Sequence, residues 1–173
     1  MKAFNPQESP ANSQPTSGSP AAVAKKAWHY FHLTDKMTGD VTEFACLDSE
    51  DKLQFAFPYD GGSTGTICFT KWAEGKDNEY KAYFDIDKGQ ILCSQSCSVF
   101  MKLDDGKPLF VSATPDSNGS SKSISLNSSY FFGPKSNRAS LREAKVLMLQ
   151  VEYYQEGRQV LTFEPDKPLD PSW

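Results

Sequence analysis

The chain has 173 residues, enough for one domain with a proper hydrophobic core plus a tail, and its hydrophobic content of 38% lies below the globular average. The net charge of −4 is spread along the chain and no Lys/Arg cluster exceeds two adjacent residues, so the basic stripe of a DNA- or RNA-binding protein is missing. No apolar run approaches the roughly 18 residues that a transmembrane helix needs, so we expect no transmembrane segment.

Residues 1–24 form a first region, rich in Ser, Pro, Ala, Asn and Gln and without an aromatic residue after Phe4. Such a segment cannot bury enough apolar surface to offset the entropy lost on ordering, so it is predicted to be a disordered leader or tether. The chain turns polar directly after Met1 and Lys2, and no secretory hydrophobic region is visible. We therefore expect either a cytoplasmic protein or one whose signal peptide is missing from this sequence.

Short apolar runs separated by turn residues fill residues 25–173, which we predict to be one domain. Their spacing of about 8–12 residues, with Gly and Asp in the turns, is typical of an antiparallel sandwich or barrel. The prediction is an all-β, mainly antiparallel fold, a β-sandwich of about ten short strands with one short helix. The runs lie at 28–34, 41–47, 53–57, 66–72, 79–86, 90–93, 97–103, 108–113, 124–126, 128–132, 146–154 and 159–164.

The single helix is expected after Ser136, which can cap one or two turns through residues 137–145 with Leu141 and Ala144 facing inward. An Ala-rich helix over residues 21–31 is the alternative to the first strand, although the aromatic residues between 28 and 31 favour the strand.

Alternation within the runs predicts which side chains are buried, because residues two apart in a strand share a face. We expect the abundant aromatic side chains to fill the core rather than to form a ligand platform. The predicted core rows are Leu53, Phe55 and Phe57; Tyr80, Ala82, Phe84 and Ile86; Val99, Met101 and Leu103; and Leu147, Leu149, Val151 and Tyr153.

The four cysteines bear on the compartment. Cys93 and Cys97 flank the three residues Ser-Gln-Ser, and a three-residue hairpin loop brings such positions within disulfide distance, so we predict a disulfide that fixes a hairpin. A redox motif would need two intervening residues and a helix start. Cys46 and Cys68 lie in neighbouring predicted strands and either form a second disulfide or remain buried thiols; the sequence does not decide. An even count in a turn-rich β domain favours an oxidising compartment.

No catalytic or metal-binding constellation assembles from the sequence. His29 and His32 are three apart on a predicted strand and therefore point to opposite faces, which argues against zinc bound with the cysteines. Carboxylate pairs such as Asp85 and Asp87 fall in predicted turns, where Asp bends the backbone. We expect no cofactor, no metal and no catalytic residues.

The best candidate for a binding loop follows Pro58. Tyr59, Asp60, Gly61 and Gly62 lie where a sandwich presents its end loops, and the glycines are expected to take positive φ. This loop lacks the Lys and the following helix of a phosphate-binding loop.

Four phrases carry a resemblance. They are WHYFHLTDKMTG (28–39), FPYDGG (57–62), the stretch from QILCSQSC to PLFVSA (90–113) and VEYYQEGRQVLTFEP (151–165). Together they resemble a group of small, largely uncharacterised bacterial envelope proteins with a signal peptide or lipoprotein signal, a Ser/Pro/Ala-rich linker and a β domain with a cysteine pair. The resemblance implies an extracytoplasmic, disulfide-bonded β-sandwich tethered through its leader, and it transfers no active-site residues.

The leading hypothesis is therefore a non-enzymatic, envelope-associated module that binds another protein, as an immunity or inhibitor factor or as an accessory of a secretion system. One alternative is a cytoplasmic mobile-element or phage protein that binds a partner with its cysteines reduced. Another is a glycan- or peptide-acting enzyme that uses a turn carboxylate pair and an aromatic cleft formed by Trp28, Tyr30, Trp72 and Tyr83.

Overall fold

The computed structural model describes residues 25–72, 80–132 and 138–173; the predicted leader, residues 1–24, lies outside the described residues. The described part is mostly strand, which confirms the all-β, mainly antiparallel fold. Its elements are β1 (His29–Thr34), β2 (Val41–Leu53), β3 (Ser63–Trp72), β4 (Lys81–Ile86), β5 (Cys97–Leu103), β6 (Leu109–Pro115), β7 (Ser123–Leu126), α1 (Ser129–Phe132), α2 (Arg138–Glu143), β8 (Leu147–Tyr153) and β9 (Gly157–Phe163).

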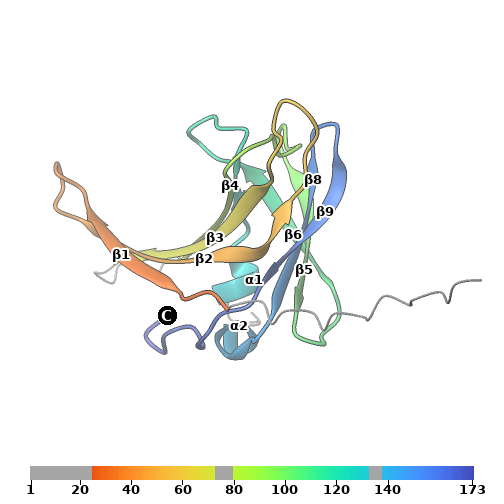
Figure 1. Cartoon of the computed structure of the whole chain (residues 1–173). Coiled ribbons are helices and arrows are strands. Elements are labelled where there is room, and N and C mark those ends of the chain that lie inside the picture. The colour runs from red at the N-terminus through yellow and green to blue at the C-terminus, as the bar shows by residue number, and fades with distance from the viewer. Residues whose placement is uncertain (1–24, 73–79, 133–137) are drawn as a thin grey trace, which may run out of the picture.

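The described strands form one curled sheet of nine strands in the order β1-β2-β3-β4-β7-β6-β5-β8-β9, with neighbouring strands antiparallel (Figure 1). The curl brings β9 beside the second half of β2. There the Thr162 N–H donates to Asp51 Oδ2 at 3.0 Å, and Gln159 Nε2 donates to the Gln54 carbonyl at 3.3 Å. The β9 end of the sheet is therefore covered by the chain itself.

Gly65 in β3 provides the room for this curl. A Cβ at this position would run into Leu161 Cδ1 of β9 and would lie 2.9 Å from Phe84 Cε2 of β4. Because a side chain at residue 65 would push β9 outward, glycine lets the two parts of the sheet approach.

The core lies inside the curl, and most of the predicted rows are buried, as the alternating burial along β4 and β8 illustrates. Leu103 is only half-buried. The prediction that Phe57 is buried is wrong, because this residue is 86% exposed. The reason is that residues 53–57 do not form a strand, because β2 continues through the turn expected at 48–52 and ends at Leu53.

A register shift between Asp48 and Lys52 makes this continuation possible. The buried Ser49 satisfies the irregular backbone there, because its Oγ donates to the Asp51 carbonyl at 2.7 Å and accepts from the Gly65 N–H at 3.1 Å. A bulge bends and twists its strand more strongly. The charged residues between the two predicted runs therefore lie in a bulged strand, in which Asp51 and Lys52 are exposed and Asp48 and Glu50 are half-buried.

Two helices lie under the sheet where the sequence predicted one. Leu141 and Ala144 are buried as predicted, whereas the predicted cap Ser136 lies outside the described residues. The run at 128–132, expected to be extended, instead contains α1, because Asn127 Oδ1 accepts from the Ser129 N–H at 3.1 Å and starts a turn. No helix among the described residues is long and apolar enough to cross a membrane.

Both cysteine pairs lie at disulfide distance. Cys46 and Cys68 are direct cross-strand partners in β2 and β3, with sulfur atoms 2.09 Å and Cα atoms 4.1 Å apart. The sulfur atoms of Cys93 and Cys97 are 2.11 Å apart. The prediction that this second pair closes a hairpin is wrong, because residues 90–93 form hydrogen bonds with the end of β8 and not with β5. The Leu92 N–H donates to the Glu152 carbonyl at 2.8 Å. Two such pairs hint at an oxidising environment.

Candidate binding face on the projecting arm

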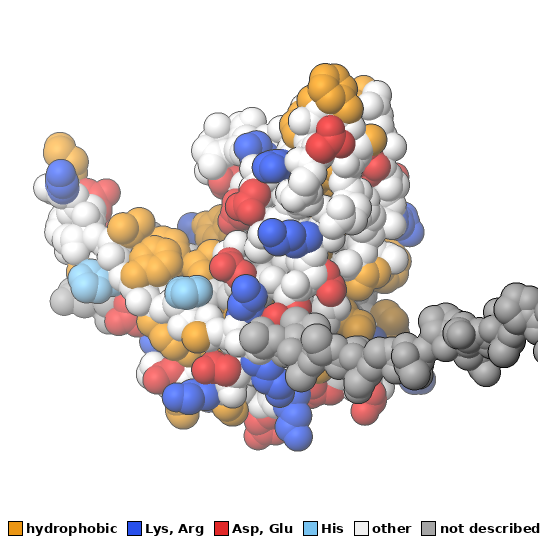
Figure 2. Space-filling view, in the orientation of Figure 1, with side chains coloured by type: hydrophobic (Ala, Val, Ile, Leu, Met, Phe, Trp, Pro, Cys, Tyr) orange, Lys and Arg blue, Asp and Glu red, His pale blue; other side chains and the backbone are white. Residues whose placement is uncertain are grey.

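β1 and the first half of β2 leave the curled body as an arm, seen at the left of Figure 1. All six residues of β1 are exposed, including Tyr30 (48%), Phe31 (46%) and Leu33 (58%). Figure 2 shows hydrophobic side chains gathered on this arm. Exposed apolar side chains that cluster on one element often mark an interaction site.

The face of β1–β4 that is turned away from the core lies on the inside of the bend between the arm and the body, above the strands in Figure 1, and is hereafter the concave face. The register pairs Phe31 with Phe44, and their rings stack with centroids 4.7 Å apart and planes within 6°. Beside them the face is hollowed by about 390 Å³. The hollow is lined by Phe31, Thr42, Phe44, Cys68, Thr70, Lys81, Tyr83, Asp85, Asp116 and Ser123.

Strand alternation explains why these residues meet. In β3 the core face carries Ile67 and Phe69, both fully buried, so the residues between and after them, Cys68 and Thr70, belong to the concave face. The cross-strand pairing of Cys46 with Cys68 places the first disulfide on this face too. The disulfide thus joins β2 and β3 where the arm leaves the body.

The far end of the hollow is acidic. Burial raises the pKa of the Asp85 carboxyl, a hydrogen bond with the Ser123 side chain opposes the rise, and the charge of Asp116 adds to it. Asp85 lies inside β4 and not in a turn, so the turn expected at this carboxylate is wrong. The hollow therefore offers aromatic rings at one end and two carboxylates at the other, with Lys81 as the cation among its lining residues.

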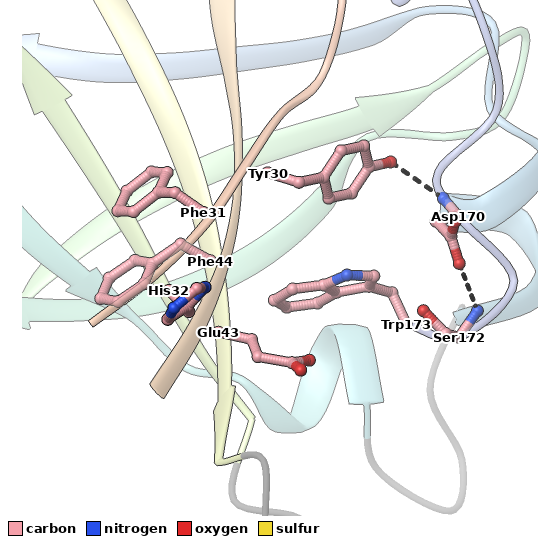
Figure 3. A pocket seen from close by; sticks show the side chains of 8 residues that line it. All are labelled: Tyr30, Phe31, His32, Glu43, Phe44, Asp170, Ser172 and Trp173. Atoms are coloured by element: carbon pink, nitrogen blue, oxygen red, sulfur yellow. Dashed lines mark hydrogen bonds between the residues drawn. The ribbon is translucent and has the colours of Figure 1, made fainter. Parts of the chain in front are cut away.

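The opposite face of the arm is held by the segment after β9, residues 164–173, hereafter the strap (Figure 3). The Asp170 N–H donates to Tyr30 Oη at 3.0 Å, and Trp173 is buried to 3% exposure. Lys71 Nζ lies 3.1 Å from Glu43 Oε2, 4.7 Å from the centre of the Trp173 ring, and 2.8 Å from the Ser172 carbonyl. These contacts fix the direction in which the arm projects.

A second hollow of about 310 Å³ lies between the strap and the arm, with Tyr30, His32, Glu43 and Trp173 among its lining residues (Figure 3). Burial raises the pKa of the Tyr30 phenol, the hydrogen bond with the Asp170 backbone opposes the rise, and the charges of Asp170 and Asp166 add to it. The ion pair and hydrogen bonds here join parts of this chain to each other, so we assign this side of the arm a structural role.

The predicted binding loop lies elsewhere. Gly61 and Gly62 have positive φ, as predicted. Tyr59 packs against Phe55 of the core with ring centroids 6.5 Å apart, and Lys88 Nζ donates to the Asp60 carbonyl at 3.2 Å. No residue of this loop lines the hollow of the concave face. Its role in binding stays a prediction.

The other sequence candidates are dispersed. His29 pairs with Cys46 and His32 with Glu43, so the histidines lie on opposite faces of β1, as predicted. Among the described residues no group of three or more His, Cys, Asp or Glu could hold a metal ion. Of the proposed aromatic cleft, Trp28 and Tyr30 line one hollow together with residues of the strap, and Tyr83 does not line it. Tyr83 lines the concave face, and the Trp72 side chain lies outside the description.

Sequence reasoning missed the importance of Phe31, Phe44 and Asp116. A signal was present in the first run, which has apolar or aromatic residues on both faces, as in Tyr30-Phe31. A strand of that kind has no single buried side and needs contacts on both. No family model, curated protein or solved structure matches this chain.

Proposed function

We propose that this protein is a non-enzymatic binding module of the cell envelope that engages another protein through the concave face. The observation that supports this most directly is the hollow beside the Phe31–Phe44 stack, which combines these two rings with the carboxylates of Asp85 and Asp116. Binding sites on proteins combine apolar surface with a few polar groups that fix orientation. The partner we envisage is the target of an immunity or inhibitor factor, or a component of a secretion system.

The energetics of Asp85 support a binding role. A carboxylate whose pKa is raised by burial and by a neighbouring negative charge costs stability at neutral pH. A hydrogen-bond donor or cation brought by a partner would relieve both causes. We therefore expect the partner to present a Lys, Arg or amide group next to an apolar side chain.

The experiment is a comparison of charge-reversal variants in a binding assay. The immobilised protein is used to capture a partner from bacterial envelope extracts, and the identified partner is then titrated against purified variants. Asp116→Lys is expected to weaken binding, because it removes one of the two negative charges of the hollow. Asp105→Lys makes the same charge change in the turn after β5, away from the hollow, and serves as the matched control. Equal affinity of both variants would contradict the proposal.

A second function is favoured by the same two carboxylates. Two acids with different environments in one hollow resemble the acid–base pairs of glycan- and peptide-cleaving enzymes. The test is turnover of peptidoglycan and of chromogenic glycosides and peptides by the wild-type protein. Activity that is lost in Asp85→Asn and kept in Asp105→Asn would support an enzyme and would displace the binding module. Without turnover, the binding module stands.

The envelope location rests on the two cysteine pairs and on the resemblance to envelope proteins. Intact-mass measurement of natively purified protein tests it, because two disulfides lower the mass by about 4 Da relative to the reduced chain. Material isolated from its native cell with all four thiols reduced would instead favour the cytoplasmic mobile-element or phage alternative.

A further inference from the structure

The two edge strands of the sheet, β9 and β1, differ in how far other described residues cover them. At the β9 end, the Asp51 carboxylate accepts from the Thr162 N–H, the Gln54 carbonyl accepts from the Gln159 side chain, and Lys26 bridges to Pro165 just beyond the strand. At the other end, every residue of β1 is exposed, and no strand of the described residues lies on its second side. β1 contains no Lys, Arg, Asp, Glu or Pro, the residues that commonly block pairing at an edge.

We propose that β1 pairs with β1 of a second copy of this chain, forming a two-fold symmetric dimer with a continuous antiparallel sheet. This inference goes beyond the proposed function and does not depend on what the concave face binds. A two-fold pairing uses the open edge of both copies at once, and the β9 ends are already covered, so the dimer is closed. A strand of another protein would have to supply a matching edge of its own.

Symmetry restricts the register. Two antiparallel strands related by a two-fold axis keep the same face of the sheet on the same side, so opposing residues must belong to the same face. The residue on the axis is then opposite its own counterpart. Axes at Phe31 and at His32 each pair five residues of β1, and the axis at Phe31 is the one that places two phenylalanine rings opposite each other. In that register Phe31 faces the partner's Phe31, Tyr30 faces the partner's His32, and His29 faces the partner's Leu33.

This register continues the aromatic row of the concave face. Phe31 already stacks on Phe44 within one copy, with centroids 4.7 Å apart. Across the axis the row becomes Phe44, Phe31, the partner's Phe31 and the partner's Phe44. Cross-strand aromatic pairs stabilise a sheet, and here they also cover ring surface that is exposed in the single copy.

Charge at the two ends of the strand supports the second copy as the occupant. The base of β1 is preceded by Lys25 and Lys26, and the turn at its tip contains Asp35, Lys36 and Asp40. In the proposed register the tip of each copy lies beside the base of the other. The base also contains the Glu50 carboxylate, whose Oε1 accepts from the Lys26 N–H at 2.9 Å. At both ends of the pair a tip with two carboxylates and one ammonium group thus meets a base with two ammonium groups and one carboxylate, so a net negative end lies beside a net positive one, although Lys26 itself faces the partner's Lys36.

The interface is small, since it consists of one short strand and its side chains from each copy. Interfaces below about 1,200 Å² belong to weak complexes. We therefore expect a concentration-dependent dimer and not a permanent one. Sedimentation velocity of the full chain, from low micromolar to several hundred micromolar, should show the sedimentation coefficient rising toward that of a dimer.

Phe31→Lys tests the contact, because it places two like charges opposite each other on the axis. The dissociation constant should rise by about tenfold or more. Phe57→Lys is the matched control, since it makes the same change at a side chain that is 86% exposed and far from β1 in the chain. A chain that stays monomeric at every concentration, or a dimer that Phe31→Lys leaves intact, would overturn the proposal.

Cross-linking tests the register separately. Phe31→Cys places the new thiol opposite its own counterpart, whereas Leu33→Cys is displaced by four residues from its own. Mild oxidation should therefore give a covalent dimer with Phe31→Cys and little with Leu33→Cys. Equal yields, or a higher yield with Leu33→Cys, would overturn the proposed pairing.

Discussion

Gly65→Ala is the change that most directly tests how the sheet closes. The added Cβ would meet Leu161 Cδ1 and would lie 2.9 and 3.2 Å from two atoms of the Phe84 ring. Leu161 and Phe84 are both fully buried, so neither can move into solvent. Real Cβ contacts below 3.0 Å essentially do not occur, and either β9 or the Phe84 ring must therefore shift.

Two opposing effects determine how much Gly65→Ala changes the free energy of unfolding. Replacing glycine lowers the entropy of the unfolded chain and by itself would stabilise the protein by about 0.4–1 kcal/mol. Inserting a methyl group into a filled core costs about 1–3 kcal/mol. The overpacking is the larger of the two effects, so the variant should lose about 0.5–2 kcal/mol of unfolding free energy.

The assay is urea unfolding followed by tryptophan fluorescence with the disulfides intact, applied to a double-mutant cycle. Leu161→Val alone should cost about 1 kcal/mol by leaving a small cavity. In the double variant the smaller side chain makes room for the new Cβ, so the combined loss should be about 0.5 kcal/mol or more below the sum. Stabilisation by Gly65→Ala, or additive losses, would refute the close approach of β3 and β9.

Two further predictions concern charge and covalent cross-links. Because burial and the charge of Asp116 raise the folded-state pKa of Asp85, the contribution of this carboxyl to stability is greatest at low pH and is lost as the pH rises through and above the ordinary Asp range. Asp85→Asn should therefore raise the urea midpoint at neutral pH, and this gain should shrink toward about pH 3. A gain that grows toward low pH would contradict the assignment. Removing the Cys46–Cys68 disulfide should lower the free energy of unfolding more than removing the Cys93–Cys97 disulfide, because the sequence separations of 22 and 4 residues correspond to about 3.4 and about 1.9 kcal/mol. The two double-Ser variants measure these losses, and a larger loss for the shorter loop would contradict the ranking.

The proposed dimer has a consequence for the proposed binding site. Phe31 belongs both to the free edge and to the hollow, so pairing through β1 would place two hollows on one continuous face. A partner with two-fold symmetry or repeated epitopes would then bind both at once, which raises avidity without new contacts. Separate measurements with Phe31→Lys and Asp116→Lys distinguish the two roles, because only the first change lies on the edge.

Several parts of the fold follow from local sequence pattern. The strict alternation of Leu147, Leu149 and Val151 predicts a strand with one buried face, and β8 has that form. The pattern failed at Phe57, where local alternation continued but the strand did not. It failed again around Asn127, whose side chain starts a helical turn that an apolar run alone does not reveal. Periodicity reports which faces are apolar, and it does not report where a backbone finds its hydrogen-bond partners.

The candidate site was much less accessible from sequence. Phe31, Phe44, Asp85 and Asp116 come from four segments, and only the register of β1 to β4 and the position of the loop before β7 bring them together. The predicted loop at Tyr59 met the local criteria of a binding loop, yet its tyrosine packs on the core. Glycine and aromatic residues in a loop indicate conformational freedom and contact area, and they carry no information on which surface lies beside them.

The sequence by itself determined the all-β class, most of the buried rows and the presence of cysteines suited to pairing, because these depend on residue type and on spacing within a strand. Tertiary structure decided that Cys46 lies opposite Cys68 and that two aspartates meet an aromatic pair on one face. It also decided that, among the strands of the described residues, β9 is covered by β2 whereas β1 has a strand on one side only. These outcomes depend on register and on the curl of the sheet. Both are set by contacts between residues far apart in the chain, such as Gly65 with Leu161, which no local pattern encodes.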